Sequence, residues 1–101
     1  MRPVIVHDDA KEETRKALEH YEQVRPELAS AFRRTLGAAI ERVRENPQFY
    51  AENEAGERLC MLGRFPYTLV YIELDDSIWV TAVAHQRRRP RYWRHRRPDG
   101  P

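Results

Sequence analysis

The chain has 101 residues, the length of one small domain, and 34% of them are charged while 41% are hydrophobic. No apolar run reaches the roughly 20 residues that a membrane-spanning helix needs, and the N-terminus lacks the apolar core of a signal peptide. We therefore expect a cytoplasmic single domain over residues 1–97, followed by a frayed tail at 98–101. The single cysteine, Cys60, excludes a disulfide framework and lies in an apolar run, where we expect a buried structural thiol. The four histidines show no metal-ligand spacing, so we predict no metal and no other cofactor.

The net charge of +2 conceals an uneven distribution. Residues 87–97 contain seven Arg and no acid, whereas residues 1–86 contain 11 Lys and Arg against 15 Asp and Glu. So dense a run of like charge repels itself unless something anionic lies against it. Arg also suits bidentate contact with phosphate or carboxylate. The predicted surface for a target protein or nucleic acid is therefore formed by Arg87, Arg88, Arg89, Arg91, Tyr92, Trp93 and Arg94.

Two simpler interpretations of this segment stay open. The arginines could form a solvated tail, and Tyr92 and Trp93 could pack as a lid over the end of a sheet. Their interleaving with arginine is also what a single-stranded RNA or an acidic peptide would require. Sequence alone does not separate these possibilities.

Two helices are predicted in the first half of the chain. Residues 10–24 carry apolar residues at helical spacing, with Asp9 as the N-cap and Glu12 completing a capping box. Pro26 ends this helix and begins the next, whose apolar stripe is the strongest periodic signal in the sequence. Pro47 ends the second helix, because the residue before a proline avoids helical backbone. With so short a connection, the two helices form an antiparallel hairpin.

Strands are predicted before and after the helical hairpin. Residues 4–6 and 58–62 suffice for short strands, and 48–57 form a loop. The runs at 68–74 and 77–85 are rich in β-branched and aromatic residues and are joined by two aspartates, which predicts a β-hairpin. The order β-α-α-β-β-β predicts an α+β fold, with a small antiparallel sheet packed against an antiparallel helical hairpin.

Two motifs near this β-hairpin carry a resemblance to a known family. They are RFPY at 64–67, followed by Tyr71, and AVAHQRRRPRYW at 82–93. Together with a looser match of Ala10, Leu18 and Tyr21 in the first helix, they make the chain resemble the RelE/ParE superfamily, the toxins of bacterial type II toxin–antitoxin systems. The resemblance covers almost the whole chain. It implies the fold derived above, with room for a parallel contact from the first strand.

The superfamily has two activities, and the residues favour one of them. RelE-like members cut mRNA on the ribosome, whereas ParE-like members act on DNA gyrase and lack the nuclease residues. RNA cleavage needs proton donors and acceptors together with cations on the phosphate. The resemblance makes Arg64, His85, Arg87 and Tyr92 the nuclease candidates, although His85 is as readily a structural residue bonded to backbone. The loop at 48–57, where the nucleases carry Lys, is acidic here and would repel RNA.

We therefore favour a ParE-like toxin that acts on DNA gyrase and to which no catalytic residue is assigned. A ribosome-dependent mRNA endoribonuclease and a non-toxic, basic nucleic-acid-binding relative are the alternatives. The resemblance further implies a cognate acidic antitoxin in a hetero-oligomer with the toxin. We expect that antitoxin to cover the arginine-rich segment and the apolar face of the first helix at Ala17, Leu18 and Tyr21.

Overall fold

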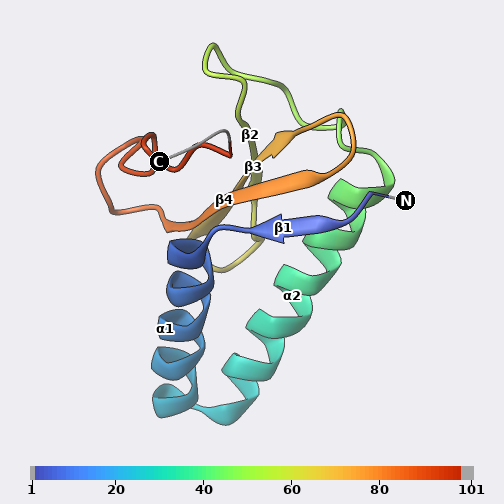
Figure 1. The fold of residues 1–101 in the computed structure, drawn as a ribbon. Helices are drawn as coiled ribbons and strands as arrows, with labels where there is room; N and C mark the ends of the chain where they lie inside the picture. Colours follow the sequence, from blue (N-terminus) through green and yellow to red (C-terminus); the bar gives the residue numbers. More distant parts are fainter. Residues whose placement is uncertain (1, 99–101) are drawn as a thin grey trace.

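The computed structural model describes residues 2–98 and places two helices against one face of a four-stranded sheet (Figure 1). The strands are β1 (Val4–Val6), β2 (Arg58–Met61), β3 (Tyr67–Glu73) and β4 (Ile78–His85), and the helices are α1 (Asp8–Val24) and α2 (Pro26–Glu45). The predicted α+β fold and its order of elements are confirmed. Of the tail expected at 98–101, residues 99–101 lie outside the part of the chain that is described.

The sheet has the strand order β1-β4-β3-β2 and is mixed. Strands β2, β3 and β4 form an antiparallel meander, but β1 pairs in parallel with β4. The predicted antiparallel sheet is confirmed for β2, β3 and β4, and β1 makes the parallel contact for which the resemblance left room. Both helices intervene between β1 and the meander, and a parallel pair requires such a long connection, whereas a tight turn produces only antiparallel neighbours.

The helix ends follow the local signals, with one exception. His7, and not the predicted Asp9, caps α1, because the His7 Nδ1 atom accepts a hydrogen bond of 3.0 Å from the Asp9 N–H. The helix accordingly begins two residues earlier than predicted, and its first two aspartates lie near the positive end of the helix dipole. Pro26 occupies the first turn of α2, and that helix ends at Glu45, as the prolines predict.

The main core lies between the helical hairpin and the sheet. The Phe32 ring of α2 lies edge-on to Phe65 at 5.2 Å and to Tyr67 at 5.3 Å. Tyr71 is fully buried and its hydroxyl donates to the Pro47 carbonyl at 2.7 Å; burial raises its pKa to about 12. Cys60 is fully buried in this core, as predicted.

A β-bulge changes which side chains of β4 face the helices. The register skips Thr81, because Val80 and Ala82 pair with successive residues of β3. Val80 and Val83 consequently both pack in the core beneath the helices, while Ala82 packs on the opposite face of the sheet. The bulge therefore turns the far half of β4, and with it the arginine-rich segment that follows, onto a different path from that of a regular strand.

Candidate functional site

The arginine-rich segment at 87–97 folds back over the face of the sheet that the helices leave open (Figure 1). The Trp93 side chain, 7% exposed, packs against Val70, Ala82 and Ala84 and forms a second, smaller core with them. Tyr92 is half-buried beside it. The segment is therefore part of the fold, and the interpretation of Tyr92 and Trp93 as a lid is confirmed over that of a solvated tail.

A buried carboxylate from the loop before β2 holds this segment down. Glu57 is 1% exposed, and it accepts hydrogen bonds from Trp93 Nε1 at 3.0 Å, Arg91 Nε at 3.1 Å and Asn53 Nδ2 at 3.1 Å. Burial opposes ionisation of this group, but the hydrogen bonds from Arg91, Asn53 and Trp93 outweigh it and hold the pKa of Glu57 below its usual range. Glu57, one of the acids of the 48–57 loop that we expected to repel RNA, is thus paired with Arg91 of the arginine-rich segment.

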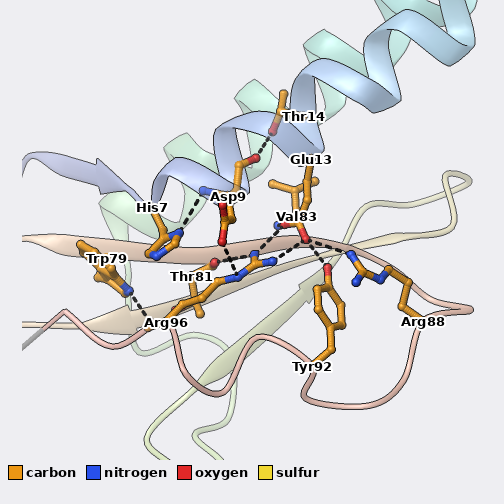
Figure 2. Close-up of polar contacts among 11 residues, drawn as sticks. His7, Asp9, Glu13, Thr14, Trp79, Thr81, Val83, Arg88, Tyr92 and Arg96 are labelled. Atoms are coloured by element: carbon orange, nitrogen blue, oxygen red, sulfur yellow. Dashed lines mark hydrogen bonds and ion pairs between the residues drawn. The ribbon is translucent and has the colours of Figure 1, made fainter. Parts of the chain in front are cut away.

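A second carboxylate, Glu13 on α1, binds the segment from the other side (Figure 2). It forms a bidentate pair with the Arg96 guanidinium, at 3.0 Å and 3.1 Å, and its Oε2 atom lies 3.6 Å from Arg88. The Tyr92 hydroxyl donates to the same carboxylate. Glu13 therefore joins α1 to three residues of the segment through one side chain that is only 13% exposed.

This ion pair also completes the sheet. Strand β1 ends at Val6, opposite Val80, so from Thr81 onward β4 is paired with β3 alone and, within residues 2–98, has no strand on the edge that faced β1. Glu13 accepts a hydrogen bond of 3.0 Å from the Val83 N–H, and Arg96 donates one of 3.3 Å to the Thr81 carbonyl (Figure 2). The pair therefore satisfies backbone groups that a longer β1 would otherwise have paired, and buried groups left without a partner would be costly.

The structure brings two of the four nuclease candidates together. His85 and Tyr92 line a small hollow of about 130 Å³, together with Arg88 and Lys16. Arg64 does not line it, and its guanidinium lies 5.1 Å above the Phe65 ring. His85 Nδ1 accepts a hydrogen bond of 3.1 Å from the backbone N–H of Arg87, the fourth candidate.

The Tyr92 hydroxyl already donates its hydrogen bond to Glu13. Burial and the hydrogen bond to Glu13 both raise its pKa above the ordinary tyrosine value. The Arg88 guanidinium covers one face of the ring at 3.7 Å from its centroid. Tyr92 is thus held neutral, with its hydroxyl and one ring face in contact with the protein itself.

The seven arginines fall into two groups. Arg96 is buried and, with Arg91 and Arg88, forms ion pairs with Glu13 or Glu57. The other four are exposed, as Arg88 and Arg91 also are, but they form no ion pair within residues 2–98. Sequence reasoning missed the pairs Arg91–Glu57 and Arg96–Glu13, because their members lie 34 and 83 residues apart along the chain. The one signal of these pairs in the sequence is the excess of arginine at 87–97, because so dense a positive charge needs anions from another part of the chain or from a partner.

The three residues predicted to meet an antitoxin lie on the inner face of α1. Ala17 is buried, and Leu18 and Tyr21 are half-buried against the main core. Their contact with an antitoxin stays a prediction. Beside them, an apolar hollow of about 270 Å³ opens between α1, α2 and the sheet. It is lined by Val6, Lys11, Thr14, Leu36, Ile40, Leu69, Val80 and Val83.

A helical hairpin packed on one face of this small mixed sheet is the architecture of the RelE/ParE-type toxins. Residues 4–90 match the model of the family described as the ParE toxin of type II toxin–antitoxin system, parDE, and the chain belongs to this family. The fold is similar to a solved chain of the chromosomal ParDE TA system from P. aeruginosa, with a TM-score of 0.72 and 17% sequence identity over 84% of this chain and 96% of that chain. A search of curated proteins found no match.

Two further observations concern residues 2–98. No helix in this range is long and apolar enough to cross a membrane. No group of three or more His, Cys, Asp or Glu side chains in the same range is arranged to hold a metal ion. The family match ends at residue 90, so Tyr92, Trp93 and Arg96 lie beyond it.

Proposed function

We propose that this chain inhibits bacterial growth by binding DNA gyrase in the cytoplasm, and that a cognate antitoxin neutralises it. The observation that carries the proposal is membership in the ParE toxin family over residues 4–90. Nothing in the proposed action requires a proton-transfer residue. The toxin would act as a binding module, through the surface that its fold presents.

The state of Tyr92 supports binding over RNA cleavage. A general acid or base must exchange a proton with the substrate, with a pKa near the working pH. The Tyr92 hydroxyl donates to Glu13, and its raised pKa moves it further from neutrality. Arg64, which would have to stabilise the phosphate, does not line the hollow that Tyr92 and His85 share.

The antitoxin would seat an apolar segment in the hollow between the two helices. The floor of this hollow is formed by Val80 and Val83, and Leu36 and Ile40 form a wall. Lys11 at its rim and the exposed arginines at 87–89 would attract an acidic chain. An antitoxin that covers both regions, and extends along α1 over the partly exposed Leu18 and Tyr21 beside the buried Ala17, would form the expected hetero-oligomer.

The proposal is tested with the purified chain, purified gyrase and supercoiled plasmid. We expect the chain to trap gyrase on DNA, so that linear plasmid accumulates after the protein is denatured and digested. The cognate antitoxin, added in equal amount, should prevent this. Gyrase activity that is unchanged at a large excess of the chain would contradict the proposed target.

A further inference from the structure

Part of the sheet's open face stays uncovered, and it is apolar. Trp93 covers the middle of this face, but β2 beyond it carries Leu59 and Met61, which are 40% and 67% exposed. Both residues point to the open face, because they pair with Val70 and Thr68 on that side of β3. A hollow of about 210 Å³ separates Leu59 from Trp93. Its remaining lining is Thr68, Ala84, His85, Gln86, Arg88 and Pro90.

The rim of this hollow is cationic. Arg88 lines it, and Arg87 and Arg89 are exposed beside it. Between residues 2 and 98, no acidic side chain forms an ion pair with Arg87, Arg89 or Arg64, whereas Arg88, Arg91 and Arg96 all have one. A backbone hydrogen bond of 2.9 Å from the Gln86 N–H to the Pro66 carbonyl holds the Arg64 turn against this rim. Arg88 therefore lines a largely apolar hollow, and its exposed neighbours in the chain, Arg87 and Arg89, have no acidic partner within residues 2–98.

We propose that this arginine-rimmed hollow, formed around Leu59 and Trp93, binds an acidic peptide segment of a partner protein. One apolar side chain of the peptide would fill the hollow beside Leu59, and carboxylates on either side of it would pair with Arg87 and Arg89. The proposed function already brings an acidic chain to the arginines at 87–89, and this assignment adds the open face of the sheet, with the hollow beside Leu59, as the place where an apolar anchor of the bound peptide lies. It rests on that function in one respect, namely that the chain acts by binding a protein.

The aromatic residues of the site favour peptide over nucleic acid. Single-stranded nucleic acids bind by stacking bases on exposed aromatic faces above a basic groove. Here Trp93 is only 7% exposed, and Arg88 covers the ring of Tyr92. The exposed apolar surface is aliphatic and thioether, from Leu59 and Met61, which suits packing against a side chain. The hollow thus combines a pocket for an apolar anchor with a rim of charge, but offers no stacking platform.

The test is fluorescence anisotropy with three labelled probes of equal length and the whole chain. The probes are an acidic peptide with a central leucine, the same peptide with serine in its place, and a single-stranded RNA. We expect the leucine peptide to bind about tenfold more tightly than the serine peptide, because one buried aliphatic side chain contributes this much. The leucine peptide should also bind more tightly than the RNA.

Two surface variants locate the site. The double variant Arg87→Glu/Arg89→Glu should weaken both peptides by about tenfold or more, and Leu59→Asp should abolish the preference for leucine. Matched controls are Arg33→Glu/Arg34→Glu, a pair of exposed arginines on α2, and Val24→Asp, an exposed apolar residue at the end of α1. All four replace exposed side chains, and circular dichroism would verify that each folds.

Three outcomes would overturn the proposed site: RNA binding more tightly than the leucine peptide, equal binding of the two peptides, or equal losses in the surface and control variants. Failure of the gyrase assay has a different meaning. If gyrase activity is unaffected while the leucine peptide still depends on Leu59 and Arg87, the peptide site is supported and only the proposed target is wrong.

Discussion

Replacing Glu13 by alanine should destabilise the fold more than any other single change on the surface of α1. The substitution leaves the Arg96 guanidinium, which is 6% exposed, without its bidentate partner. It also removes the acceptor of the Val83 N–H and of the Tyr92 hydroxyl. These groups cannot all turn to solvent, because the segment that carries two of them is fixed by Trp93.

The magnitude follows from these contacts. Removing one partner of a buried ion pair typically costs about 3 to 5 kcal/mol. A domain of this size has a total stability of roughly 5 to 15 kcal/mol, so the alanine variant should lose a large share of it and, at the lower end of this range, should be close to its unfolding midpoint without urea. Glu13→Gln keeps an acceptor for Val83 and loses only the charge, and we expect it to lose about 1 to 3 kcal/mol. The glutamine variant should therefore stay folded, so that its free energy of unfolding can be compared with that of the native chain.

The assay is urea unfolding followed by far-ultraviolet circular dichroism. Glu12→Ala is the matched control, because Glu12 is the neighbouring acid on α1 and pairs with an exposed Arg15. We expect the control to unfold like the native chain. Arg96→Leu combined with Glu13→Leu should lose less than the sum of the two single changes, since no charge is then left buried alone. If Glu13→Gln, Glu13→Ala and Glu12→Ala unfold at the same urea concentration, the structural role assigned to Glu13 is wrong.

Three other predictions concern single side chains. Glu57→Gln should cost about 1 to 2 kcal/mol at neutral pH, because charge-assisted hydrogen bonds to Glu57 are lost while the partly exposed Arg91 can turn to solvent. Because the pKa of Glu57 is below its unfolded value of about 4.3, its contribution is present above that pH and is lost as the pH falls through the folded pKa. Urea midpoints should thus fall less steeply in acid for Glu57→Gln than for the native chain; parallel curves would contradict this. Tyr71→Phe should cost about 1 kcal/mol in the same assay, by loss of the bond to Pro47, and no change would exclude that bond. Tyr92→Phe should still arrest growth when induced, and harmless expression of the folded variant would favour the nuclease.

Local sequence signals were sufficient for most of the fold. Pro26 and Pro47 mark the ends of the helices, and two runs rich in β-branched and aromatic residues, joined by two aspartates, mark the hairpin of β3 and β4. Each of these signals acts within a few residues of the feature that it predicts. The N-cap was wrong by two residues because His7, unlike the aspartates around it, is not a preferred capping residue.

The candidate site was less accessible to sequence reasoning, because its contacts are long-range. The arginine-rich segment is evident from composition, and so is its need for anions. The bulge at Thr81 and the early end of β1 determine which anion pairs with the segment there, because together they bring Glu13 against the open edge of β4. Because both faces of β4 are buried, its run of apolar residues does not reveal a one-residue register shift.

The central claim is that the chain acts on gyrase and not on mRNA. It is tested most directly by a short induction of the chain alone in a bacterial host, with mapping of RNA 5′ ends and a reporter of DNA damage in the same culture. We expect growth arrest, an active damage reporter and intact mRNA. New mRNA ends within translated codons, with a silent damage reporter, would contradict the account and identify the chain as a ribosome-dependent nuclease.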